Sequence, residues 1–261
     1  MVHVITVASG KGGTGKTTVT INLGTVLASY GKKTFIMDAD IGMANIGLMI
    51  GLENVPVTLH EVLAGTAGIN EAIYDGPGGV KVIPSGISLQ GFQQANPERL
   101  KDVLKDLVDR CDFLLIDAPA GISRDGVIPL SVADGVILVV NPELSSIVDA
   151  LKTKILTEVV GGKVIGVIVN RIVAEHAEHL AEKMEKALGV GVIGVIPEDP
   201  LVKKAAAFKV PVVTKFPLSD SSKAIKRIAA KIAGKTVEET EVAEKDKFID
   251  KFAKALFRGR K

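Results

Sequence analysis

Residues 10–18 read Gly10-Lys11-Gly12-Gly13-Thr14-Gly15-Lys16-Thr17-Thr18, which fits the P-loop pattern G-x-x-x-x-G-K-[ST]. A buried strand is predicted directly before this loop at Val2–Ala8, and a helix directly after it at Thr17–Tyr30. Glycines let the backbone take conformations that side chains forbid and approach an anion closely. Strand, loop and helix therefore predict an α/β fold that binds a nucleoside triphosphate.

Each part of the loop has an expected role in holding phosphate. The N–H groups of the loop converge with the N-terminus of the following helix, whose dipole favours negative charge. Lys16 is expected to reach the β- and γ-phosphates, and the Thr17 hydroxyl to ligate Mg²⁺. Lys11 is a second lysine in the loop, and it suggests that the protein pairs with a copy of itself around the nucleotide.

Composition limits the alternatives. The 261 residues allow one large α/β domain, and a net charge of +2 does not make the chain as a whole a polyanion binder. Cys111 is the single cysteine, which excludes an internal disulfide and a Cys-x-x-Cys site. The sequence shows no signal-peptide pattern and no apolar run of about 18 residues. We therefore expect a cytoplasmic protein.

Apolar, β-branched runs alternate with helical patterns along the chain. Near-continuous apolar strands are typical of parallel sheets covered on both faces, and the alternation implies right-handed βαβ units. We expect a doubly wound, mostly parallel sheet with helices on both faces, spanning residues 1–233. The further predicted strands are Lys33–Met37, Val80–Ile83, Phe113–Ile116, Gly135–Val140, Val164–Val169 and Val192–Ile196. The further predicted helices are Thr58–Leu63, Asn96–Arg110, Ser145–Val159, Glu175–Leu188, Asp199–Phe208 and Asp220–Ala233.

Acidic residues follow two predicted strands at the edge where open parallel sheets bind ligands. Asp117 ends the strand Phe113–Ile116, and an acid there can hold Mg²⁺ through water. Asp38 and Asp40 follow Lys33–Met37, so one can face the metal shell while the other orients an attacking water. No Asn-Lys-x-Asp stretch for guanine occurs, which favours ATP. The alternative is that these acids only cap turns or helices.

Several stretches together resemble the MinD/ParA ATPases, which carry a deviant Walker A loop. Residues 11–18 resemble that loop, residues 38–42 (Asp-Ala-Asp-Ile-Gly) the switch I segment, and residues 117–121 (Asp-Ala-Pro-Ala-Gly) the Walker B and switch II segment. Residues 141–149 and 194–199 are similar to MinD in particular. The resemblance spans residues 1–233, and it implies a Mg²⁺-dependent ATPase of the P-loop fold.

The resemblance implies roles for the charged residues of these motifs. Lys11 would cross the interface of an ATP-bound dimer and touch the partner's phosphates. Asp40 would position the water for hydrolysis, and Asp38 and Asp117 would lie in the magnesium shell. Intrinsic hydrolysis is expected to be slow, because such switches normally receive part of their stabilisation from a partner acting in trans.

The resemblance also implies a site for the base. Asn170 and Arg171, expected after the strand Val164–Val169, match the pair that packs on adenine and recognises it. Pro197 and Glu198 match a loop beside the base. From the residues alone, Asn170-Arg171 also fits an ordinary strand-end turn.

The C-terminal segment has a different pattern. Residues 234–244 are polar and mostly acidic and predict a linker, and residues 245–261 predict an amphipathic helix with lysine and arginine opposite an aromatic face. This resembles the membrane-targeting helix of MinD and predicts reversible binding to an anionic membrane. The alternative is a helix docked on its own domain or on a partner. The side chains expected to enter lipid are Phe248, Ile249, Phe252, Leu256 and Phe257.

We therefore expect a nucleotide-switched homodimer, peripherally bound to the cytoplasmic face of a membrane, that acts in placing the division site or positioning other complexes. A protein activator or cargo is expected, but the sequence does not identify it. One rival is a ParA-type ATPase that binds DNA and partitions chromosome or plasmid cargo. Another is an assembly factor, which the lack of paired cysteines disfavours.

Overall fold

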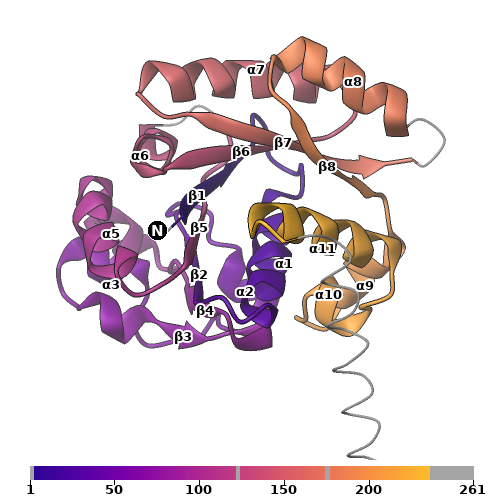
Figure 1. Cartoon of the computed structure of the whole chain (residues 1–261). Coiled ribbons are helices and arrows are strands. Elements are labelled where there is room, and N and C mark those ends of the chain that lie inside the picture. The colour runs from indigo at the N-terminus through magenta and orange to yellow at the C-terminus, as the bar shows by residue number, and fades with distance from the viewer. Residues whose placement is uncertain (1–2, 122–123, 174–176, 236–261) are drawn as a thin grey trace, which may run out of the picture.

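The computed structural model describes residues 3–121, 124–173 and 177–235. Its centre is an eight-stranded sheet in the order β3-β4-β2-β5-β1-β6-β7-β8, in which β3 runs antiparallel to β4 and the other pairs are parallel (Figure 1). Because β1 is central and the chain winds outward from it in both directions, the sheet is doubly wound, as predicted. The strands are β1 His3–Ala8, β2 Thr34–Asp38, β3 Tyr74–Asp75, β4 Lys81–Ile83, β5 Phe113–Asp117, β6 Gly135–Val140, β7 Val164–Ile172 and β8 Val192–Pro197.

Helices cover both faces of the sheet (Figure 1). One side carries α1 Lys16–Ser29, α2 Ile46–Ile50, α9 Pro200–Ala207, α10 Val212–Lys215 and α11 Asp220–Ile232. The other side carries α3 Leu59–Ala64, α4 Leu89–Gln94, α5 Leu100–Val108, α6 Arg124–Val132, α7 Leu144–Val159 and α8 Ala177–Leu188.

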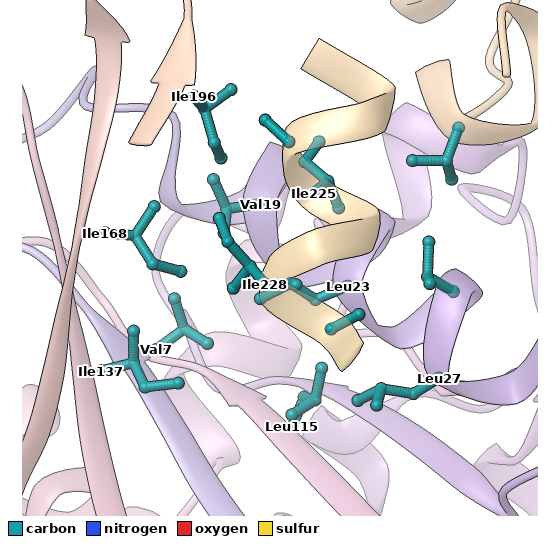
Figure 2. Close-up of a cluster of buried hydrophobic side chains, with 14 of the residues drawn as sticks. Val7, Val19, Leu23, Leu27, Leu115, Ile137, Ile168, Ile196, Ile225 and Ile228 are labelled. Carbon is teal, nitrogen blue, oxygen red and sulfur yellow. The ribbon is translucent and has the colours of Figure 1, made fainter. Parts of the chain in front are cut away.

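The core between α1, α11 and the sheet is built almost entirely of branched aliphatic side chains (Figure 2). Val7 and Leu115 rise from neighbouring strands and meet Leu23 of α1, while Ile228 of α11 closes the cluster. Both Leu23 and Leu115 are completely buried, so truncating either to alanine should cost about 2.7–5.0 kcal/mol. This packing fixes the start of α1, and with it the loop that precedes α1.

The predicted strands are all present, with small shifts at their ends. The prediction was wrong for the end of Val164–Val169, because β7 continues to Ile172 and therefore contains Asn170 and Arg171. The register shifts between Asn170 and Ile172, so the strand continues past an irregularity that ends the apolar run. The two-residue edge strand β3 is too short to leave a periodic pattern.

Four helices were not predicted: α2, α4, α6 and α10. Three of them have six residues or fewer, and α6 contains Pro129, a residue that opposes helix interiors. The helix predicted at Asn96–Arg110 begins instead as a 3-10 turn at Pro97–Arg99 before α5. The helix predicted at Thr58–Leu63 is present as α3, with a capping box between Thr58 and Glu61 and a left-handed Gly65 after its last turn.

The predicted tail lies outside the described residues, as does the linker beyond Lys235. The last helix of the domain, α11, ends at Ile232, next to the predicted domain boundary at residue 233. Within the described ranges, no helix has both the length and the apolar character needed to cross a bilayer.

Candidate functional site

The loop between β1 and α1 has the backbone that phosphate binding requires. Gly13 and Gly15 have φ of 78° and 90°, in the left-handed region that favours glycine. No side chain caps the N-terminus of α1, so its first N–H groups remain directed at the loop. A Cβ on Gly10 would lie 2.2 Å from the carbonyl carbon of Asp149, which shows how closely the loop approaches the backbone of α7.

Asp117, the last residue of β5, gathers three side chains from the start of α1. Its carboxylate accepts hydrogen bonds from Lys16 Nζ at 3.0 Å and Thr17 Oγ1 at 2.6 Å. Thr20 Oγ1, one turn further along α1, donates to the same carboxylate at 3.0 Å. The Lys16–Asp117 ion pair is buried, and it joins the P-loop helix to the neighbouring strand.

Asp38 lies directly opposite Asp117, at the end of β2. Its carboxylate accepts backbone N–H bonds from Asn45 and Ile46, each at 3.0 Å, and from Asp40 at 3.1 Å. Burial, reinforced by the negative charge of Asp117, raises the pKa of Asp38 to about 7. The site thus contains two buried carboxyl groups side by side, and Asp38 is the one whose pKa is raised.

The two acids of the Asp-x-Asp pair face different surroundings. Asp38 is completely buried, whereas Asp40 is partly exposed and accepts a 3.0 Å hydrogen bond from the N–H of Met43. Asp38 is therefore the member of the pair that lies beside Asp117. Asp40 lies on the loop that follows β2, where its side chain can contact solvent or a bound ligand.

Lys11 contacts residues at the start of α7. Its Nζ lies 2.5 Å from Glu143 Oε2 and 3.1 Å from Ser145 Oγ, at the start of α7. Both side chains of this ion pair are partly exposed, so it is worth little on its own, about 0–1 kcal/mol. In this single chain the second lysine is held at the surface by its own α7.

The residues predicted to surround the base do lie together. A pocket at the ends of β7 and β8 is lined by Asn170, Arg171, Pro197 and Glu198 together with Gly15 of the loop. Arg171 Nε lies 3.7 Å from Glu198 Oε2. Arg171 also has a φ of 60°, uncommon for a residue with a side chain.

Asn170 makes a contact that sequence reasoning did not foresee. Its Nδ2 donates a 2.8 Å hydrogen bond to the carbonyl oxygen of Thr14, inside the P-loop. Its amide therefore braces the loop as well as lining the pocket. Because the two residues are far apart in the chain, no local pattern signals this pairing.

Three further residues of the site were not singled out: Thr20, Glu143 and Ser145. Thr20 lies one helical turn after Lys16, so the helical period could have placed it next to Asp117. Glu143 and Ser145 lie in the stretch 141–149 that resembles MinD, but nothing in that stretch names Lys11 as their partner.

The residues present fit a Mg²⁺-bound triphosphate. Thr14 Oγ1 is buried without a hydrogen-bond partner in the described residues, and Cβ atoms on Gly12 and Gly13 would meet nothing within 4 Å. Across the residues the structure describes, no group of three His, Cys, Asp or Glu could hold a metal. Mg²⁺ is usually held by one or two carboxylates, waters and the substrate's own phosphates, so two acids and a hydroxyl suffice.

A glycine loop at the winding reversal of a doubly wound sheet, backed by lysine, threonine and aspartate, defines a P-loop nucleotide-binding domain. The profile of the CobQ/CobB/MinD/ParA nucleotide binding domain matches residues 5–212. The chain belongs to the MinD/ParA family of nucleotide-binding ATPases within this group.

Several relatives show where the chain lies in the family. An ATP-binding protein of Methanocaldococcus jannaschii is 52% identical over 98% of this chain and 97% of its own. The cell division ATPase MinD of Pyrococcus furiosus superposes with a TM-score of 0.84 at 37% identity, covering 90% of this chain and 99% of that one. MinD of Pyrococcus horikoshii, solved with Mg-ADP, gives 0.83 at 35% identity, with coverages of 89% and 96%. MinD in the MinC:MinD complex of Aquifex aeolicus gives 0.77 at 34% identity, with coverages of 90% and 97%.

Proposed function

We propose that this protein is an ATP-driven molecular switch that hydrolyses ATP, pairs with a second copy of itself in the ATP state and binds membrane reversibly. The observation that carries the proposal is the cluster of Lys16, Thr17 and Asp117 beneath the P-loop. It supports the nucleotide-dependent part of the proposal, because P-loop enzymes use such a lysine on the β- and γ-phosphates and such a hydroxyl on Mg²⁺.

ATP and Mg²⁺ are the proposed ligands. Lys16 would hold the phosphates, Thr17 would ligate the metal, and Asp38 and Asp117 would hold its water shell. The Mg-ADP complex of the Pyrococcus horikoshii relative supports this choice. The metal, when bound, supplies neutralisation of the charge that develops on the transferred phosphoryl group. The base would occupy the pocket that Asn170 and Glu198 line.

Asp40 is the proposed residue for positioning the attacking water. Hydrolysis of this kind depends on orientation and charge rather than covalent chemistry, so a single well-held carboxylate contributes strongly. The partial exposure of Asp40 supports the role, since its carboxylate is open to water that enters the site. Basal hydrolysis is expected to be slow until a partner completes the site.

Lys11 is the proposed contact between two copies. Its ion pair with Glu143 is exposed and weak, so it can open when a second copy offers a phosphate. The tail would then appear twice in the assembly. Linking two weak anchors raises the apparent affinity for the membrane by about 10²–10⁴, which supports membrane binding that depends on the nucleotide.

A protein partner is proposed to bind α7. This helix exposes a stripe of large apolar side chains, and a contiguous apolar patch on a protein surface is typical of an interaction site. The stripe starts beside the residues that hold Lys11, so a partner seated on it would sense the nucleotide state. The MinC:MinD complex of the Aquifex relative supports a protein partner. The α7 stripe consists of Leu144, Val148, Leu151, Ile155 and Val159.

Spatial regulation of cell division, or the positioning of other complexes, is the proposed role, supported by the names of the Pyrococcus relatives. The test is co-sedimentation with anionic liposomes, with Mg-ATP or Mg-ADP, of the wild type and of full chains carrying Phe252→Asp or Asp40→Ala. Wild type and Asp40→Ala should pellet with Mg-ATP, while Phe252→Asp should not. If no form pellets, the membrane proposal is wrong. DNA binding that survives Phe252→Asp would favour the ParA-type alternative.

A further inference from the structure

His60 is a buried polar side chain that the site described so far does not use. It belongs to α3 and is only 1% exposed. Its Nε2 lies 2.9 Å from the carbonyl oxygen of Ile41. A carbonyl only accepts hydrogen bonds, so Nε2 carries the proton and donates it. The bond joins α3 to the loop that carries Asp40.

The other ring nitrogen of His60, Nδ1, is also buried. It has no hydrogen bond in the part of the chain that the structure describes. Burying an acceptor in this way is unfavourable, and such groups in native proteins need an explanation. The fold nevertheless makes room for this ring, because Cβ atoms on Gly86 and Gly91 would lie only 2.6 Å and 2.7 Å from Nδ1. An aromatic or aliphatic side chain would fill the slot without leaving an unpaired nitrogen.

What the histidine offers that an apolar side chain does not is the single donated bond to Ile41. Ile41 directly follows Asp40, and the N–H of Asp40 is itself bonded to the buried Asp38. The loop is thus held on both sides of the Asp40 side chain, by Asp38 before it and by His60 after it. Both anchors are buried, whereas Asp40 itself is partly exposed.

We propose that His60 is a positioning residue for ATP hydrolysis: by holding the Ile41 carbonyl it sets where the Asp40 carboxylate stands relative to the attacking water. This inference rests on the proposed ATPase function and on the role of Asp40 in it. His60 is buried, and its side-chain hydrogen bond goes to the Ile41 carbonyl, so we expect it to act through the loop. Its loss should therefore lower the rate of the chemical step without weakening the binding of ATP.

The experiment measures kcat and KM for ATP in His60→Phe, which fills the ring slot without a donor, and in His60→Gln, whose amide can reach Ile41. We expect His60→Phe to lower kcat by about 10- to 100-fold, because a shift of about 1 Å at a catalytic group has such an effect. KM should stay within about twofold, since ground-state binding is untouched. His60→Gln should recover most of the rate.

Two further variants complete the design. His3→Phe is the control, because His3 is an exposed histidine stacked on Phe113, at the end of β1 that lies away from the P-loop. This variant should keep wild-type kinetics. If His60→Phe does not fold, His60→Asn takes its place. Its amide is too short to reach the Ile41 carbonyl, and the same loss of kcat is expected.

A double mutant separates positioning from general damage. Groups that act as one unit are strongly non-additive, so Asp40→Ala/His60→Phe should be no slower than Asp40→Ala alone. Wild-type kcat in a folded donor-less variant, or a further loss of rate in the Asp40→Ala background, would overturn the inference. Failure of the proposed function would look different: the wild type itself would not hydrolyse ATP, or Asp40→Ala would leave its rate unchanged.

Discussion

Asp38 and Asp117 lie opposite each other as the last residues of the adjacent strands β2 and β5, and neither is accessible to solvent. Lys16 pairs with Asp117, and among the described residues no lysine lies within hydrogen-bonding distance of the Asp38 carboxyl. Two neighbouring buried acids share one cation. A divalent ion at this place would relieve the imbalance, which is why the pair suits a metal shell better than a structural ion pair.

The contribution of Asp38 to the stability of the ligand-free protein should fall as pH rises through the range in which its carboxyl titrates. Burial and Asp117 raise the pKa of Asp38 from 3.8 to about 7, so the folded state favours its protonated form. The stabilisation this gives is complete below pH 3.8 and is lost as pH rises toward and through 7. Urea unfolding across this range should show a weaker downward trend for Asp38→Asn than for the wild type. Equal trends would contradict the shifted pKa.

Substituting alanine for Gly10 should affect stability, whereas substituting alanine for Gly12 should affect nucleotide binding. A Cβ on Gly10 would collide with the α7 backbone, so Gly10→Ala should destabilise the ligand-free protein by about 1–3 kcal/mol. A Cβ on Gly12 meets nothing, and its φ is not in the left-handed region, so Gly12→Ala should leave stability unchanged. Gly12→Ala should instead weaken nucleotide binding, because the open space is where phosphate is proposed to lie. Chemical denaturation and titration with a fluorescent ATP analogue separate the two effects.

Lys11 should matter for self-association and not for folding. Lys11→Ala removes a partly exposed ion pair with Glu143 and an exposed hydrogen bond to Ser145, so the free energy of unfolding should change by no more than about 1 kcal/mol. ATP-dependent dimers, followed by light scattering after size exclusion, should be lost in this variant. Glu143→Gln is the matched control, since it breaks the same ion pair but leaves Lys11 in place. A dimer that survives Lys11→Ala would contradict the proposed role.

The two faces of α7 should tolerate charge very differently. Ile155 is 51% exposed, so Ile155→Lys should change stability by no more than about 0.5 kcal/mol. Ala150 is 1% exposed, on the buried side of the same helix, and Ala150→Lys should cost more than about 2 kcal/mol. Thermal melts of the two variants check this. A large loss for Ile155→Lys would mean that the α7 stripe is covered within the protein and does not face a partner.

The sequence was enough to predict what depends on short-range pattern. The sheet class, the seven longer strands and the P-loop all follow from apolar runs and glycine spacing, since each is a property of consecutive residues. The helix α3 was predicted for the same reason, since the residues that begin and end it are close together in the chain. The acids at the ends of β2 and β5 were found because parallel strands bring their ends together.

The rest depends on contacts that no local pattern encodes. The Lys11–Glu143 pair joins residues 132 positions apart, and the His60–Ile41 bond depends on how α3 meets the Asp40 loop. The short helices α2, α4 and α10 form where tertiary packing outweighs weak local preference. Arg171 takes a left-handed backbone that its residue type disfavours, so only the folded structure could reveal it.

The bond between Asn170 and Thr14 also bears on how the protein is made. It joins residues 156 positions apart, so the phosphate loop, which is synthesised before β7, receives this brace only after β7 has been synthesised. Domains generally fold as units during synthesis. A nascent chain that stops short of residue 170 therefore carries the complete P-loop motif without the contact that holds it in shape. Nucleotide capture should accordingly begin late in translation, and ribosome-bound chains of increasing length would show it as a step and not as a gradual rise.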